Sequence, residues 1–197
     1  MQLGAPGFLH DRWSALHPIF VGGPAWAELG PDLSRHGLEY VTAPLATGSS
    51  LPDGRAAIAL VDHEAMAVEL DRLGETDGWN ALFGDVGASV QTLAGLMSDG
   101  LDGPEAQATL ARLLGDRRDD PLPFGQLLAG TAADLVREHF KTEELRLLAA
   151  PWPLHFGIGP EDSSGALWVV MALAALAAGV PTPVGAVAVL PTRSSLW

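Results

Sequence analysis

The chain has 197 residues, of which 48% are hydrophobic, and this is enough for one sizeable core. Its 24 acidic and 11 basic residues give a formal net charge of -13, which argues against nucleic acid and against an anionic membrane surface, because both reward clustered lysine and arginine. The absence of cysteine excludes disulfides, iron–sulfur clusters, thiolate metal sites and a cysteine nucleophile.

The N-terminal sequence MQLGAPGFLHDRW has neither the basic start nor the apolar run of a secretory signal, so we expect a cytoplasmic protein. Residues 7–20 show no clean periodicity and predict a loop with a short helix. Residues 37–42 and 56–61 have the pattern of two strands, which we expect to form a hairpin around residues 48–55.

Helices are expected over most of the remaining chain. Asp62 is suited to cap a helix over residues 63–73, with Gly74 at its end. Apolar residues recur at helical spacing over residues 77–97, although three glycines weaken that helix, each by about 1 kcal/mol relative to alanine. Further helical segments are predicted at residues 104–114, 124–129 and 131–140 and after Thr142, which is expected to cap the last of them.

A segment without any charge, residues 165–180, is the most apolar part of the chain. Asp162, Ser163 and Ser164 offer side chains for its N-cap, and Gly179 and Pro181 mark its end. It is too short to span a membrane comfortably, which takes about 20 apolar residues. A helix that is apolar on all sides needs partners on all sides, so we expect it beneath other helices or facing a cavity for an apolar molecule.

These elements predict an α+β protein, with a small antiparallel sheet or hairpin followed by a mainly helical body. Most tryptophans lie among apolar residues, which is typical of a core or of the walls of an apolar cavity. We expect an apolar small molecule as the partner. Whether the chain forms a homo-oligomer is left open.

Motifs for metal, nucleotide or nucleophile chemistry are incomplete. His63-Glu64 begins like the zinc-protease helix motif, but Ala67 stands where the second histidine ligand is required, so a metal site is not predicted. Gly157-Ile158-Gly159 lacks the third glycine of a dinucleotide-binding loop, and there is no G-x-S-x-G elbow.

Three blocks, in order, resemble the phytoene dehydrogenase-like FAD-dependent oxidoreductases, the flavoproteins related to carotenoid desaturases and amine oxidases. The first block is GFLHDRWSALHP at residues 7–18. The second is HGLEY at residues 36–40, with DGRA at residues 53–56 and then Trp79. The third is FKTE at residues 140–143, with His155 and then GVPTPVG at residues 179–185.

The resemblance implies a substrate-binding domain in which a sheet backed by helices covers an apolar tunnel leading to the flavin. Residues 1–22 would adjoin the FAD-binding domain, residues 23–185 would form the substrate-binding domain, and residues 186–197 would be a divergent tail. Asp11, Ser14 and His17 would lie nearest the FAD. The cofactor would carry the hydride chemistry, so no catalytic residue is assigned.

Two departures from the family pattern limit the function expected. The family's dinucleotide-binding fingerprint is absent, and the sequence after Gly185 no longer resembles the family. We therefore expect an internal portion of an oxidoreductase that acts on an apolar substrate, incomplete and inactive alone, with a tail such as truncation or a shifted reading frame would produce. The alternative is a non-catalytic helical module that binds an apolar ligand or a protein partner.

Overall fold

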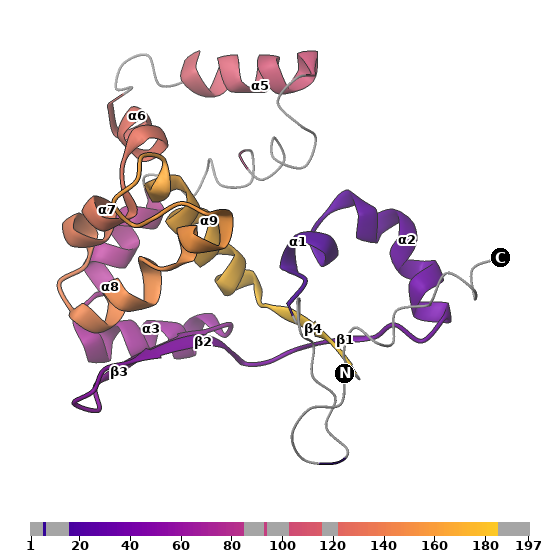
Figure 1. Cartoon of the computed structure of the whole chain (residues 1–197), viewed down its shortest axis with the longest axis horizontal. Coiled ribbons are helices and arrows are strands. Elements are labelled where there is room, and N and C mark those ends of the chain that lie inside the picture. The colour runs from indigo at the N-terminus through magenta and orange to yellow at the C-terminus, as the bar shows by residue number, and fades with distance from the viewer. Residues whose placement is uncertain (1–5, 7–15, 85–92, 94–102, 116–121, 185–197) are drawn as a thin grey trace. The chain divides into compact units, whose positions relative to one another are not determined.

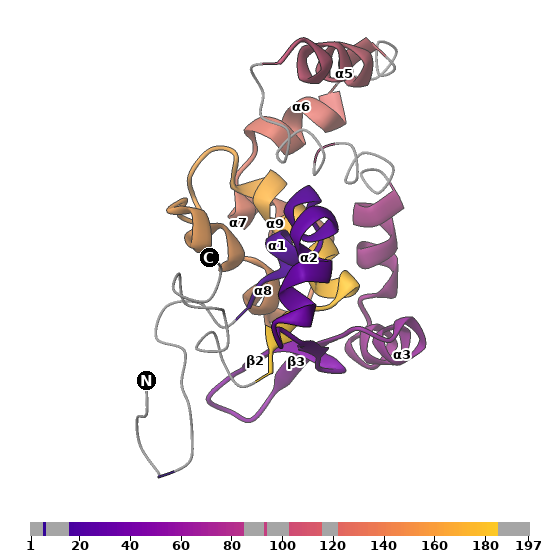
Figure 2. The same cartoon turned by 90° about the vertical axis from the view of Figure 1, so that its right-hand side faces the viewer.

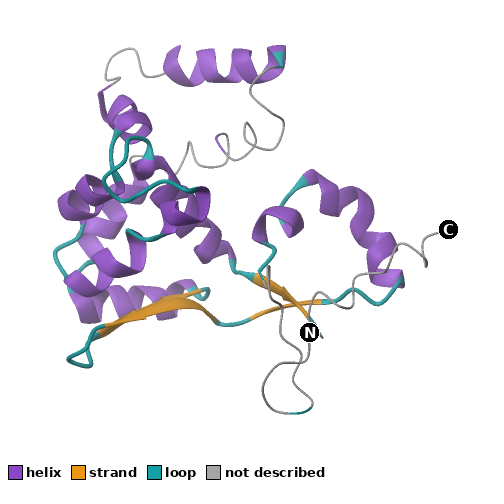
Figure 3. Ribbon diagram, viewed as in Figure 1, coloured by secondary structure: helices purple, strands orange, loops and turns teal. Residues whose placement is uncertain are grey.

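The computed structural model describes residues 6, 16–84, 93, 103–115 and 122–184 and divides the chain into two compact units (Figure 1). One unit consists of Met1–Pro44 with Gly179–Trp197, and the other consists of Leu45–Ala178. Helices predominate, and the strands form two small antiparallel sheets (Figure 3). The predicted α+β class is confirmed.

In the first unit, residues 16–44 and 179–184 form two helices and a two-stranded sheet. Its elements are α1 (Pro18–Val21), α2 (Pro24–Arg35), β1 (Tyr40–Thr42) and β4 (Pro181–Pro183). Each helix begins with a proline, whose fixed φ suits the first turn. β1 pairs with β4 in antiparallel register, with Tyr40 opposite Pro183. The sequence reasoning predicted neither α2 nor β4, because Pro31 lies inside α2 and two of the three residues of β4 are prolines, which cannot donate ladder hydrogen bonds.

A hairpin of β2 (Leu45–Ser50) and β3 (Ala56–Leu60) opens the second unit. Its turn is closed by the Leu51 amide, which donates to the Arg55 carbonyl at 2.8 Å, and Gly54 takes a φ of 88° there. The predicted pairing of residues 37–42 with residues 56–61 is therefore wrong. The predicted turn is correct, but residues 45–50 supply the partner strand, and the expected first strand pairs with β4 instead.

The described residues of the second unit form seven further helical elements with defined bounds. They are α3 (His63–Leu73), α5 (Pro104–Gly115), α6 (Leu122–Ala129), α7 (Ala132–His139), α8 (Glu143–Ala149), the 3-10 helix η1 (Trp152–Phe156) and α9 (Gly165–Ala178). Residues 76–84 are also helical, and the rest of the predicted helix over residues 77–97, apart from residue 93, lies outside the described residues. The predicted tail strand after Gly185 lies outside them as well.

α3 follows the sequence signals closely. The Asp62 carboxylate accepts from the Ala65 amide at 2.8 Å, and Gly74 ends the helix in the left-handed region with a φ of 71°. α3 packs against β3 (Figure 2). On this helix Val68 is 71% exposed, whereas Met66 and Leu70 are buried.

α9 is the central helix of this unit, and it contacts α6, α7, η1 and both strands of the hairpin. Val169 and Val170 are fully buried. The predicted capping side chains hold the preceding loop instead, since the Asp162 carboxylate accepts from the Gly159 amide and the Ser163 hydroxyl donates to the Ala129 carbonyl. The expectation that α9 lies beneath other helices is confirmed.

Candidate functional site

His17 is the one FAD-adjacent candidate within the described residues, because Asp11 and Ser14 lie outside them. Its Nδ1 lies 2.7 Å from the Tyr40 hydroxyl, and its amide donates to the Pro181 carbonyl at 3.0 Å. Tyr40 also meets Trp26 edge-to-face, with ring centroids 5.3 Å apart. Burial raises the pKa of Tyr40. His17 therefore joins α1 to the β1–β4 sheet.

The glycine-containing loop that the structure describes is not built like a dinucleotide cradle. A dinucleotide needs a glycine-rich turn whose amides meet the pyrophosphate at a helix N-terminus. The glycine-containing loop at Gly157 to Gly159 instead leads into Pro160, and the Gly159 amide is already held by Asp162. One ring nitrogen of His17 is likewise engaged.

The second unit contains an apolar cavity of about 310 Å³. Four elements line it. β3 contributes Ala59 and Leu60; α3 contributes His63, Met66, Ala67 and Leu70; the helix at residues 76–84 contributes Trp79, Asn80 and Phe83; and α9 contributes Leu173, Leu176 and Ala177.

Helical periodicity explains which side chains reach this cavity. The α3 residues are spaced i, i+3, i+4 and i+7, and those of α9 are spaced i, i+3 and i+4, so each set occupies one face of its helix. Leu70, Leu173 and Leu176 are buried, whereas His63 and Asn80 are exposed. The cavity therefore has an apolar floor and a polar edge. α9 thus contributes to the lining of a cavity, and the expectation that this cavity takes an apolar molecule stays a prediction.

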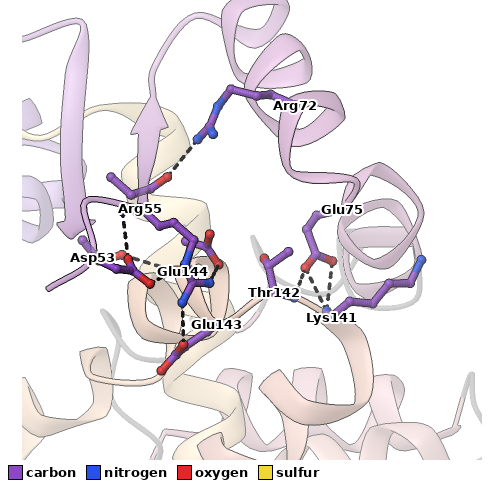
Figure 4. A network of polar contacts seen from close by, with 10 residues as sticks. Asp53, Arg55, Arg72, Glu75, Lys141, Thr142, Glu143 and Glu144 are labelled. Carbon is purple, nitrogen blue, oxygen red and sulfur yellow. Dashed lines mark hydrogen bonds and ion pairs between the residues drawn. The ribbon is translucent and has the colours of Figure 1, made fainter. Parts of the chain in front are cut away.

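Glu75 anchors the helix that carries Trp79. Its side chain is fully buried, and its carboxylate accepts from the backbone amides of Lys141, at 2.8 Å, and Thr142 (Figure 4). The Glu75 carbonyl in turn accepts from the Trp79 amide at 3.0 Å. Trp79 stacks on the buried Phe140 with ring centroids 6.3 Å apart. The helix at residues 76–84, which forms one wall of the cavity, is thus joined to the N-terminus of α8.

Glu69 joins α3 to strand β3, which forms another wall of the cavity. This buried carboxylate accepts from the Ile58 amide at 3.1 Å and from the Arg72 guanidinium at 2.7 Å. The hydrogen bond from Arg72 and then that from Ile58 lower the pKa of Glu69, against the opposing effect of burial. Arg72 also donates to the Ala56 carbonyl, so α3 is held against β3 beside the cavity (Figure 4).

Arg55 joins the hairpin turn to α8. Its guanidinium pairs with Asp53 at 2.9 Å and with Glu143 and Glu144 at 3.1 Å each (Figure 4). The hydrogen bonds that Arg55 donates to Asp53 and then to Glu143 raise the pKa of Arg55. Because the guanidinium is half exposed, these pairs contribute orientation more than stability.

Sequence reasoning missed the buried carboxylates at positions 69 and 75. Glu69 lies three residues after the buried Met66 and therefore on the same face of α3. This helical spacing could have indicated from the sequence that Glu69 is buried. Glu75 directly follows the capping glycine, and no local pattern reveals that it meets a backbone segment far along the chain.

The described residues offer neither a metal-binding cluster nor a helix that could span a membrane. Within residues 6, 16–84, 93, 103–115 and 122–184, no group of three or more histidine or acidic side chains could hold a metal ion. Of the helices in these same ranges, none has both the length and the apolar character needed to cross a membrane.

Comparison with known proteins returned no match: no family model, no curated protein and no solved structure is similar to this chain.

Proposed function

We propose that the chain binds an apolar small molecule in this cavity and thereby serves as the substrate-binding portion of an FAD-dependent oxidoreductase of the phytoene dehydrogenase-like type. The observation that carries the binding is the 310 Å³ cavity, whose floor is formed by buried leucines of α3 and α9. Ligand sites are typically mostly apolar clefts of about 300–1,000 Å³. The reaction class rests on the three sequence blocks described above.

In such an enzyme the contribution of the cavity residues would be to bind and orient the substrate and to exclude water. Leu70, Leu173 and Leu176 supply apolar surface that is already removed from solvent. A ligand entering there would bury its own apolar surface, at about 25 cal/mol per Å². No acid or base is required of these residues, because the flavin supplies the hydride chemistry in this class.

Binding is tested with 1-fluorooctane, a small apolar probe, by isothermal titration calorimetry. Ala67→Trp places a large ring in the cavity lining, whereas Val68→Trp places the same ring on the exposed face of the same helix. We expect Val68→Trp to bind the probe like the wild type and Ala67→Trp to lose binding. The proposal is overturned if the wild-type protein does not bind the probe, or if Ala67→Trp binds it equally well.

A second candidate function is a non-catalytic module that binds an apolar ligand. It is favoured by the lack of a dinucleotide cradle among the described residues. The two functions are separated by mixing the purified protein with FAD, removing free cofactor on a desalting column and recording the visible absorption spectrum. Retained flavin supports the oxidoreductase. A colourless, cooperatively folded protein that binds 1-fluorooctane supports the module.

A further inference from the structure

Two polar side chains interrupt the otherwise apolar lining of the cavity. They are His63, at the first position of α3, and Asn80, in the helix at residues 76–84. Neither makes a hydrogen bond to another described residue, and both are exposed. Their donors and acceptors are therefore free for a ligand, whereas the leucines of the floor offer none.

We infer that the cavity takes a small amphiphile, with its apolar tail against α9 and one neutral hydrogen-bonding head group, such as a hydroxyl or carbonyl, at the edge formed by His63 and Asn80. This inference rests on the proposed binding of an apolar molecule and specifies the class of that molecule.

The head group is inferred to be neutral because of the charges around this edge. No lysine, arginine, aspartate or glutamate is among the described residues that line the cavity. The nearest charged neighbours in sequence are acidic and exposed, namely Asp62 and Glu64 beside His63 and Asp77 one turn before Asn80. These carboxylates disfavour an anionic head. The same carboxylates attract a cationic head, but they do so from outside the lining, which contains no carboxylate to pair with it directly.

Both edge residues match a neutral head chemically. A neutral imidazole has one donor and one acceptor, and a carboxamide has two donors and an acceptor. A hydroxyl can donate to one of these side chains and accept from the other, whereas a carbonyl can only accept. The inferred ligand therefore satisfies groups that its tail alone would leave unpaired.

The volume sets the approximate size of the part of a ligand that the cavity can hold. A water molecule occupies about 30 Å³ of the liquid, so a cavity of 310 Å³ corresponds to roughly ten atoms of that size. A chain of about eight carbons with one polar atom meets this limit. 1-Octanol and 1-fluorooctane have the same number of non-hydrogen atoms and differ in the hydroxyl, so they form a matched pair.

The test is calorimetric titration of the full chain with 1-octanol, 1-fluorooctane and octanoate. One net hydrogen bond corresponds to roughly a two- to tenfold change in Kd. His63→Ala and Asn80→Ala should each raise the Kd for 1-octanol by that factor and change the Kd for 1-fluorooctane much less. Octanoate should bind more weakly than 1-octanol. His155→Ala is the control, because this exposed histidine lies in the same unit but does not line the cavity.

The outcomes separate the inference from the proposed function. The inferred amphiphile is overturned if the two edge variants change the Kd for 1-octanol and for 1-fluorooctane by the same factor, or if octanoate binds most tightly. Either result leaves the proposed binding of an apolar molecule intact. If no probe binds, both fail. Thermal unfolding of each variant monitors its fold, and an edge variant that unfolds is replaced by His63→Phe or Asn80→Leu, which also remove the polar group.

Discussion

At the scale of single residues, the second unit depends on buried carboxylates that accept from backbone amides. Glu75 receives the amides of Lys141 and Thr142, and Glu69 receives the amide of Ile58. A buried amide without a hydrogen-bond partner costs about 1–3 kcal/mol of stability. These two carboxylates therefore stabilise the fold mainly by accepting from such amides, and less through their charge. They hold two walls of the cavity in place.

Thr142 permits a residue-scale test of capping. It occupies the N-cap position of α8, yet its side chain makes no capping hydrogen bond, and its buried hydroxyl has no partner within the described part of the chain. The predicted capping role of the Thr142 side chain is therefore wrong. The Glu75 carboxylate accepts from the amide of Thr142 itself, which is a different backbone group from those that an N-cap side chain would satisfy. Thr142→Val should leave the free energy of unfolding unchanged or raise it by up to about 1 kcal/mol, since it removes an unsatisfied group.

Urea denaturation measures this change. Thr131→Val is the matched variant, because the Thr131 hydroxyl does cap α7 by accepting from the Asp134 amide at 3.0 Å. Thr131→Val should lower the free energy of unfolding by about 1 kcal/mol. A similar loss in Thr142→Val would contradict the arrangement described for α8.

The lowered pKa of Glu69 predicts a pH dependence of stability. Its pKa in the folded protein lies below the unfolded value of about 4.3, so the unfolded state binds more protons in this range. The stability due to Glu69 is therefore fully present above about pH 4.3 and is lost as pH falls through the folded pKa. Urea midpoints of wild type and Glu69→Gln should differ at pH 7 and converge toward pH 3. A constant difference would contradict the prediction.

At the scale of elements, close backbone approach decides where two helices meet. Gly78, in the helix at residues 76–84, faces the end of α7, and a β carbon there would lie 1.9 Å from the His139 carbonyl oxygen. Gly165, at the start of α9, approaches Ala132 of α7 in the same way, with 2.9 Å to its amide nitrogen. Glycine is required at these two positions because a β carbon would prevent the close approach of the two backbones. Their φ angles are ordinary, so backbone conformation is not the reason.

Two alanine substitutions in one helix test this requirement. Gly78→Ala should destabilise the protein by about 1–3 kcal/mol, the usual cost of forcing extra atoms into a packed contact. Gly84→Ala should stabilise it by up to about 1 kcal/mol, because alanine favours helix and no described atom lies within 4 Å of its new methyl group. Thermal unfolding followed by circular dichroism measures both. Equal effects would show that helix propensity outweighs the close approach.

At the scale of the whole molecule, the cavity belongs to one unit. All of its lining residues fall within Leu45–Ala178, a continuous stretch of the chain. The other unit brings together two separate stretches through the β1–β4 ladder. Its aromatic contacts, which include His17 and Tyr40, contribute nothing to the cavity lining.

A fragment that comprises residues 45–178 should therefore fold and bind 1-fluorooctane with the Kd of the full chain, within about twofold, because it retains every lining residue. Circular dichroism and calorimetry check folding and binding. The control is the full chain with Tyr40→Phe, which loses only the hydrogen bond to His17. It should bind 1-fluorooctane with the same Kd as the wild type. A folded fragment that fails to bind would show that the first unit is needed for the site.

The sequence by itself determined the features that depend on neighbouring residues. Asp62 and Gly74 predicted both ends of α3, and the uncharged run at residues 165–180 predicted a central helix, because capping and hydrophobic burial act over one or two turns. The turn before β3 was likewise predicted by its own residues. The resemblance to flavoproteins stays a prediction, as do the places of Asp11, Ser14 and His17 beside FAD.

Only the tertiary structure decided which distant segments meet. Residues 40–42 pair with residues 181–183, and the Glu75 carboxylate accepts from the Lys141 and Thr142 amides just before α8. The cavity likewise needs faces from four elements, and His63 and Asn80 share its edge although their own sequence neighbours do not indicate this. Such contacts depend on how helices pack across the core, and local propensity and periodicity carry no information about the partner.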